Sequence, residues 1–225
     1  MHLPDGLLNP ILIVVLWIVS ILFVIFGFYR ISNSSFFKEE DSEKLIPYIG
    51  VIAAVIFAFQ FVNYPVPGGT SGHLVGGTLV GVILGPWASV IVLFMVLIVQ
   101  SFFGDGGFTA IGANTFNMGI IGGIIGLFIA RAVIRLLKRS ELAKEIKVTI
   151  ATAIGSYIAI ILAAAICGFE IGIGGAVPIE FAVPVMIFWH VFIGIGEAVI
   201  SALIVYYIYK TKPVLIMTEE FMGVN

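Results

Sequence analysis

The chain is predicted to be an all-α integral membrane protein, a bundle of about seven transmembrane helices with its amino terminus outside and its carboxyl terminus in the cytoplasm. Three observations predict this class. Hydrophobic residues fill 60% of the 225 positions and charged residues only 11%, against about 25% charged in soluble domains. Long apolar runs recur along the whole chain. The basic residues cluster in a few of the connections between those runs.

Seven apolar runs, each read as a helix, set the predicted order of the bundle. The third and fourth are separated only by Gly85 and Pro86. The third is too short to cross a hydrocarbon core alone unless it is tilted or extended by its flanks, so the expected number of crossings is seven, plus or minus one. The predicted helices span residues 9–29, 46–62, 74–84, 86–103, 115–137, 147–168 and 185–209.

The basic residues give an independent test of this count. They fall in or beside the connections that follow the first, fifth and seventh helices, which seven crossings place on one side of the membrane, and by the positive-inside rule that side is the cytoplasm. The outer side then carries acids but no Lys or Arg and is expected to attract cations. The basic residues are Arg30, Lys38, Lys44, Arg131, Arg135, Lys138, Arg139, Lys144, Lys147, Lys210 and Lys212, and the outer acids are Asp5, Asp105, Glu170 and Glu180.

No composition change divides the chain, so 1–225 is predicted to form a single transmembrane metal-binding domain of a multi-pass cell-membrane protein. The outer connections 63–73 and 104–114 are rich in Gly and turn-forming residues. Irregular backbone at membrane depth is tolerated only where protein buries it or where it lines a cavity. These loops are therefore expected to dip inward and build a site, with ordinary tight connections as the alternative. Residues 213–225 are expected to form a cytoplasmic tail.

The amino-terminal segment 1–8 contains a ready-made nitrogen chelator. The α-amine of Met1, the backbone nitrogen of His2 and an imidazole nitrogen of His2 can close two fused rings around one metal ion. A fourth nitrogen from a distant histidine would complete a square plane, the geometry that such sites offer to Ni(II) or Cu(II). The first residues carry no positive charge, so no cleavable signal peptide that would remove the chelator is expected.

His73 is the predicted fourth ligand, because it lies on the same side of the membrane as His2 and is expected to open the third helix. The other histidine, His190, is expected about one turn into the last helix, with Glu197 seven residues further along the same face. An acid inside a membrane helix suggests a function. For His190 and Glu197, helix packing or hydrogen bonding behind a ligand is favoured over direct ligation.

Signatures of catalysis are absent from the sequence. It contains neither a His-Glu-x-x-His motif nor a phosphate-binding Gly-x-x-x-x-Gly-Lys-Ser/Thr loop, so the chain is not expected to be an enzyme or to hydrolyse ATP. The single Cys167 excludes an intrachain disulfide. No nucleic-acid partner and no resident cofactor are expected.

Several motifs together resemble the CbiM/NikM family, the substrate-binding membrane subunits of energy-coupling factor (ECF) transporters for cobalt and nickel. The resemblance covers nearly the whole chain, and the nickel branch looks slightly closer. It implies a seven-helix bundle that holds its ion with Met1, His2 and His73. The motifs are Met-His-Leu-Pro-Asp-Gly at 1–6, Pro-Gly-Gly-Thr-Ser-Gly-His-Leu-Val-Gly-Gly at 67–77, Leu-Gly-Pro-Trp-Ala at 84–88, Gly-Ala-Asn-Thr-Phe-Asn-Met-Gly at 112–119 and Gly-Ile-Gly-Glu-Ala at 194–198.

The family also implies partners: a transmembrane coupling protein, two ATP-binding-cassette (ABC) ATPases and, in some members, a small accessory membrane subunit. The expected function is therefore the substrate-specific subunit of an ECF-type ABC importer that binds Ni(II) or Co(II) from outside. Asn114 is expected to help hold the amino terminus in place, and Asp105 to support the site. The alternatives are a passive divalent cation channel lined by the outer acids and a membrane-embedded metalloenzyme.

Overall fold

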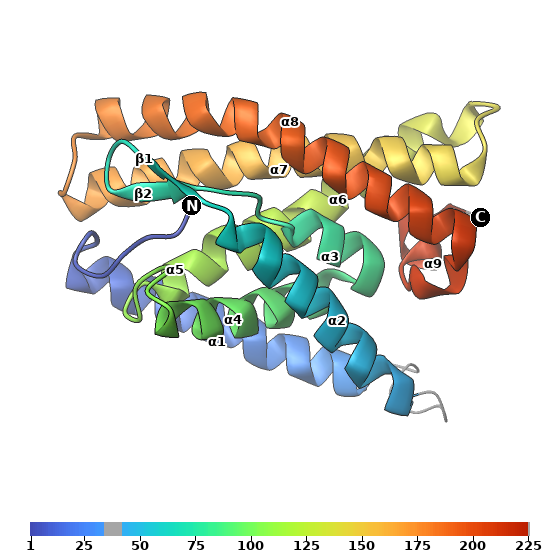
Figure 1. Ribbon diagram of the computed structural model, residues 1–225, viewed down its shortest axis with the longest axis horizontal. Helices are drawn as coiled ribbons and strands as arrows, with labels where there is room; N and C mark the ends of the chain where they lie inside the picture. The colour runs from blue at the N-terminus through green and yellow to red at the C-terminus, as the bar shows by residue number, and fades with distance from the viewer. Residues whose placement is uncertain (34–41, 225) are drawn as a thin grey trace.

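The structure, a computed structural model that describes residues 1–33 and 42–224, is a helical bundle with one short β-hairpin (Figure 1). Lys38, one of the basic residues, lies outside the described part. The elements are α1 (Pro10–Ser32), α2 (Ser42–Phe61), β1 (Tyr64–Val66), β2 (Thr70–Gly72), α3 (Gly77–Leu84), α4 (Pro86–Phe102), α5 (Ile111–Thr115), the π-helix η2 (Phe116–Ile125), α6 (Gly126–Leu136), the 3-10 turn η3 (Leu137–Arg139), α7 (Lys144–Gly174), α8 (Ile179–Thr211), the 3-10 turn η4 (Pro213–Leu215) and α9 (Glu219–Met222).

Each of the seven predicted helical runs corresponds to a helix, but several boundaries differ. The fifth helical run begins at Ile111, so the end of the predicted loop 104–114 is helical. The middle of this run, Phe116–Ile125, is a π-helix. The last helix begins at Ile179 rather than 185, because the helix accommodates Pro184, which costs one backbone hydrogen bond without ending it. The connection between α7 and α8 is only four residues long, since α7 continues to Gly174.

Among the described residues, four helices are long and apolar enough to cross a membrane: α1, the continuous run Ile111–Arg139, α7 and α8. The apolar parts of α2 and α4 are shorter, and α3 has only eight residues, about 12 Å at 1.5 Å per residue. The structure is therefore that of a multi-pass membrane protein. The number of crossings and the orientation of the termini stay predictions.

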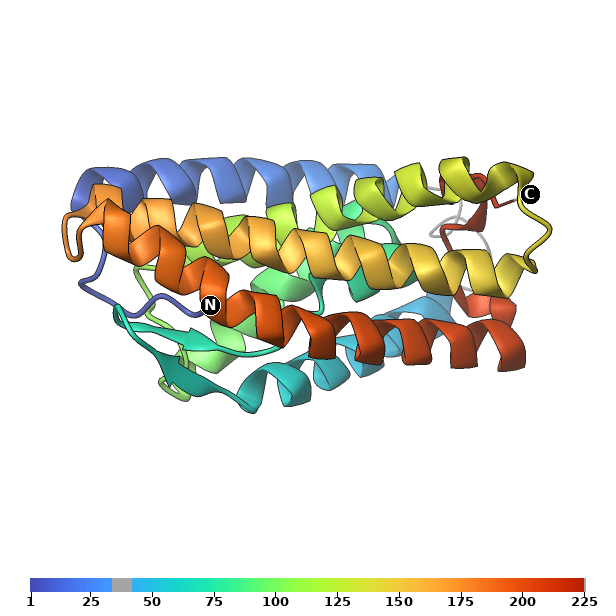
Figure 2. The same ribbon diagram turned by 90° about the horizontal axis from the view of Figure 1, so that it is seen from above.

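The bundle has α7 and α8 side by side along one side and α1 packed against α4 along the other (Figures 1 and 2). The short helix α3 and the π-helix η2 lie between them and contact each other closely. At Gly77, an added Cβ would stand 2.4 Å from the carbonyl oxygen of Met118, so only glycine permits this approach of two backbones. The interior of the bundle is thus built partly from main chain.

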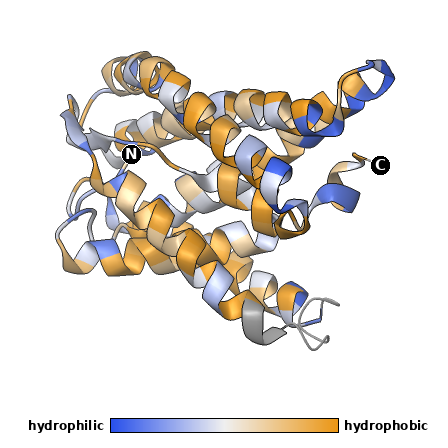
Figure 3. Ribbon diagram, turned by 45° about the vertical axis from the view of Figure 1, so that its right-hand side comes forward, coloured by the Kyte–Doolittle hydropathy of each residue, from blue (hydrophilic) through white to orange (hydrophobic). Residues whose placement is uncertain are grey.

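The helix bodies are mostly hydrophobic, and hydrophilic residues gather towards their ends (Figure 3). On α1, Ile11 is 78% exposed and Val14 is 56% exposed. A contiguous apolar surface of this kind is unusual on a water-soluble monomer and is the surface that a lipid environment requires.

The carboxyl-terminal segment folds back onto the bundle. The backbone N–H of Met217 donates to the carbonyl of Ile83 at 2.8 Å, and the hydroxyl of Thr218 donates to the carbonyl of Val82. These carbonyls belong to the last turn of α3, where a helix has no partners of its own for them. Met222 in α9 is buried. The predicted tail 213–225 is therefore, up to residue 224, a packed segment that caps α3.

Candidate metal site

The amino terminus is inserted into the bundle, next to the hairpin and α8 (Figures 1 and 2). Met1 and Leu3 have no exposed surface, and His2 is 3% exposed. Hydrophobic burial of the Met1 and Leu3 side chains stabilises this insertion. A free amine and a histidine, both ordinarily solvated groups, are thus brought inside the protein.

Three regions of the chain hold the inserted segment in place. Asn114 in α5 pairs with the backbone of Leu3 in both directions: its Oδ1 accepts from the Leu3 N–H at 2.8 Å, and its Nδ2 donates to the Leu3 carbonyl at 3.2 Å. The carboxylate of Asp5 accepts from the backbone N–H groups of Phe108 and Thr109 at 3.1 and 2.7 Å. Asp5 therefore links the amino-terminal segment to the loop before α5 while it stays exposed.

Strand β2 contributes the third set of contacts. The Met1 amine donates to the carbonyl of Ser71, and the backbone N–H of His2 donates to the Ser71 hydroxyl at 3.2 Å. The hydroxyl of Thr70 donates to the His2 carbonyl at 3.0 Å. Two of the three nitrogens expected to form the chelate, the amine and the His2 amide, thus both contact one residue of the hairpin.

The imidazole rings of His2 and His73 are stacked, with centroids 4.1 Å apart and planes inclined by 21°. Nε2 of His2 lies 3.1 Å from Oε1 of Gln100, and Nδ1 lies 2.9 Å from Oδ1 of Asp105. The Asp105 carboxylate can only accept, so this contact favours a proton on Nδ1 in the ion-free protein. A shift of the proton to Nε2, where Gln100 Oε1 can accept it, would free the lone pair of Nδ1 for an ion.

His73 lies in the stretch between β2 and α3, four residues before the helix begins, and so does not open α3 as expected. Its Nδ1 lies 2.8 Å from the carbonyl of Leu74. This carbonyl can only accept, so Nδ1 carries the proton and Nε2 carries the lone pair. Nε2 is buried and has no hydrogen-bond partner in the structure. An unpaired buried nitrogen of this kind is a candidate ligand.

Burial favours the proton-free forms of these nitrogen groups. Desolvation lowers the pKa of the Met1 amine to about 5, and it also lowers the pKa values of His2 and His73, in the latter case well below the usual range. The charge of the amine adds to the lowering at both histidines. At neutral pH the amine and both rings therefore present lone pairs, the form that binds metals.

Glu197 positions the turn after His73. Its two carboxylate oxygens accept the backbone N–H groups of Val75 and Gly76 at 2.7 and 2.8 Å. Gly76 has a φ of +73°, in the left-handed region that favours glycine. An added Cβ at Gly76 would also stand 2.4 Å from Ile56 Cδ1. The carboxylate thus joins α8 to the segment that presents His73.

His190 lies about three turns into α8, deeper than expected, because the helix begins earlier. It is fully buried, and its Nδ1 lies 2.7 Å from the carbonyl of Met186 in the same helix. Its charge contributes to the lowered pKa of His73.

The expectation that Glu170 faces the outer surface is wrong. Glu170 is 5% exposed within α7, and its carboxylate accepts from Asn117 Nδ2 at 2.6 Å.

The structure thus brings together Met1, His2, His73, Asp105 and Asn114. Within the described residues, no group of three or more His, Cys, Asp or Glu side chains is arranged to hold a metal ion. The expected ligand set is of a different kind, because only two of its four nitrogens come from side chains, the imidazoles of His2 and His73. Sequence reasoning missed the polar contacts of Gln100, Ser71 and Thr70. A lone amide within the apolar run of α4 was the signal that could have identified Gln100.

A model of the CbiM family, described as the cobalt uptake substrate-specific transmembrane region, matches residues 2–215. A putative fused nickel transport protein, NikMN, from Archaeoglobus fulgidus is 38% identical over 226 aligned residues, covering 99% of this chain and 70% of that protein. A putative metal transport protein from Methanocaldococcus jannaschii is 36% identical, with both chains covered in full.

A putative cobalt transport protein from Methanosarcina barkeri is 30% identical over 99% of this chain and 95% of its own length. Among solved structures, a truncated transition metal transporter superposes with a TM-score of 0.79 at 32% identity, covering 93% of this chain and 99% of that one. The match spans nearly the whole sequence and extends to the fold. The chain belongs to the CbiM family of nickel and cobalt uptake membrane proteins.

Proposed function

We propose that this protein is the substrate-specific membrane subunit of an ECF-type ABC importer and binds Ni(II) or Co(II) through Met1, His2 and His73. The observation that carries this proposal is the burial of a free amine and a histidine against a second histidine whose Nε2 has no partner. Four nitrogens are within one small region: the amine, the His2 amide, His2 Nδ1 and His73 Nε2.

Ion binding requires local rearrangement, which the contacts define. The amine and the His2 amide nitrogen must leave Ser71, and the His73 ring must turn out of its stacked position on His2. The amide must also lose its proton, so binding releases protons, and release of the ion requires their return. A four-nitrogen plane suits Ni(II) geometrically, which favours nickel over cobalt as the substrate.

Removal of His73 tests this proposal. Isothermal titration with Ni(II) is expected to show at least about 100-fold weaker binding for His73→Ala, or ~2.7 kcal/mol. His190→Ala is the matched control, because its Nδ1 also contacts a backbone carbonyl and its Nε2 is also buried without a partner, whereas the ring stacked on His2 is that of His73. It should change the affinity by less than about threefold, or ~0.7 kcal/mol. Equal losses in the two variants would exclude His73 as a specific ligand.

The partners in this proposal are a coupling protein and two ABC ATPases in the cell membrane, since the sequence lacks a phosphate-binding loop. Vesicles that contain this chain alone, with ATP on the side of the basic loops, are expected to accumulate no nickel. Co-reconstitution with the coupling protein and ATPases should give uptake that ATP drives. Concentrative uptake by the chain alone would contradict the assignment. A passive channel would let the ion equilibrate, and it would not be affected by blocking the amine.

A further inference from the structure

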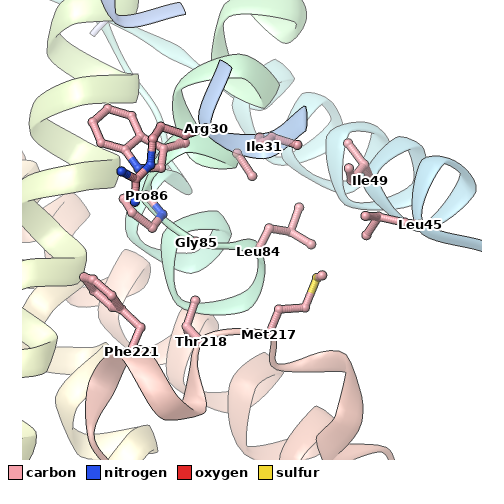
Figure 4. Close-up of a pocket in the computed structure, with 12 residues that line it drawn as sticks. Arg30, Ile31, Leu45, Ile49, Leu84, Gly85, Pro86, Met217, Thr218 and Phe221 are labelled. Atoms are coloured by element: carbon pink, nitrogen blue, oxygen red, sulfur yellow. The ribbon is translucent and has the colours of Figure 1, made fainter. Parts of the chain in front are cut away.

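A cavity of about 330 Å³ opens at the end of the bundle opposite the amino terminus (Figures 1 and 4). Its walls come from the end of α1, the first turns of α2, the α3–α4 junction and the carboxyl-terminal segment. At the junction, Gly85 has a φ of +100° and Pro86 begins α4, so the chain turns sharply and leaves room beside it. Here this region is called the basic end, after Arg30, Arg131 and Arg139.

The cavity combines one cation with apolar walls. Arg30 is the only charged side chain among the described residues that line it, and none of those residues is acidic. A second cation lies behind the wall: the guanidinium of Arg131 stands 4.5 Å from the ring centroid of Phe221, and Phe221 lines the cavity. Arg30 is therefore the group of the lining that suits an anionic ligand, although Glu219 and Glu220 lie nearby in α9 outside the lining.

A second hollow lies next to the cavity along the surface of α1. It is lined by Leu22, Ile25, Phe26 and neighbouring aromatic residues, and Trp87 lines both hollows. Phe26 and Trp87 are in edge contact, with ring centroids 4.7 Å apart. Leu22 and Ile25 are 58% and 60% exposed. From Arg30 to Leu22 this face extends about 12 Å along the helix, at 1.5 Å per residue.

We propose that this surface binds an anionic phospholipid, with its phosphate at Arg30 and an acyl chain along α1 past Trp87. The cavity takes a charged group at the membrane boundary, and the apolar hollow leads from it towards the membrane interior. Trp and Tyr side chains at that boundary are typical of the membrane interface, and basic pockets between helices bind lipid head groups. A protein partner would not need a charged pocket that continues into a groove on the lipid-facing side of one helix.

Tryptophan quenching by brominated lipids tests this proposal on the full-length protein. Phosphatidylcholine vesicles are prepared with brominated phosphatidylglycerol or, for reference, with brominated phosphatidylcholine. The part of the quenching that Trp87→Phe removes reports the site. The apparent association constant for the anionic lipid should exceed that for phosphatidylcholine by about fivefold, the factor that ~1 kcal/mol per basic residue gives.

Arg30→Gln should abolish this preference, whereas Arg139→Gln should keep it, since Arg139 is exposed at the same end but does not line the cavity. Gel filtration establishes that both variants are folded, and the wild-type comparison of the two lipids needs no variant. Inorganic phosphate should not compete. Equal quenching by the two lipids, equal effects of the two variants, or displacement by phosphate would overturn the proposal. Equal quenching by the two lipids is also the result expected if the cavity binds a partner protein instead of a lipid.

Discussion

The two ends of the bundle place their polar groups differently. At the amino-terminal end, an amine and two imidazoles are buried, and backbone, amide and carboxylate partners surround them. At the basic end, the charged side chains lie at the surface, as in the exposed ion pair between Lys210 and Glu145 at 2.5 Å. Exposed pairs of this kind contribute little to stability. Buried polar groups are costly to leave unpaired, so substitutions at the amino-terminal end should have the larger effects.

Glu197 offers the strongest test of this difference, because it holds two backbone N–H groups beside His73. Glu197→Ala is expected to destabilise the protein by about 2–4 kcal/mol, since two buried donors lose their partner. Glu197→Gln keeps one acceptor oxygen and should lose about half as much. Glu180→Ala, an exposed acid in the first turn of the same helix, is the control. Thermal unfolding in detergent measures all three, and an unchanged midpoint for Glu197→Ala would contradict the inferred role.

Gln100 gives a smaller effect that concerns the ring of His2. Gln100→Leu removes the group that would accept Nε2–H once Nδ1 binds an ion, because Gln100 Oε1 lies 3.1 Å from Nε2. Nickel affinity is expected to fall about tenfold, in the range known for partners of metal-binding histidines. Gln100→Glu retains an acceptor and should bind more tightly than Gln100→Leu. Titration calorimetry distinguishes them, and equal affinities for wild type and Gln100→Leu would remove Gln100 from the site.

The helices could be predicted because each run of apolar residues must bury its own backbone hydrogen bonds in lipid. The break between α3 and α4 at Gly85 and Pro86 could also be predicted, because it depends on the local sequence alone. The π-helical stretch η2 was not, since its hydrogen-bond pattern depends on close packing of glycines such as Gly77 against it. The early start of α8 likewise depends on tertiary contacts that outweigh the local effect of Pro184.

The candidate site was partly predictable. The sequence could place Met1, His2 and His73 near one another, because all three are predicted on the same side of the membrane. The expected contact of Asn114 with the amino-terminal segment is present in the structure. The acceptor role of Gln100 depends on the angle at which α4 passes His2, which no pattern in the sequence encodes. The clamp by Glu197 also joins residues more than a hundred positions apart. Their roles in metal binding stay predictions.

The central claim, that the amino terminus itself binds the ion, is tested most directly by one comparison of Ni(II) affinity. One protein carries a single extra residue before Met1, and the other carries the same residue after Asn225. The extension moves the amine out of the fused-ring geometry and forces a longer chain into a buried position, so binding should weaken by at least about tenfold, or ~1.4 kcal/mol. The carboxyl-terminal addition should leave the affinity unchanged. Equal affinities for the two proteins would show that the amine is not a ligand.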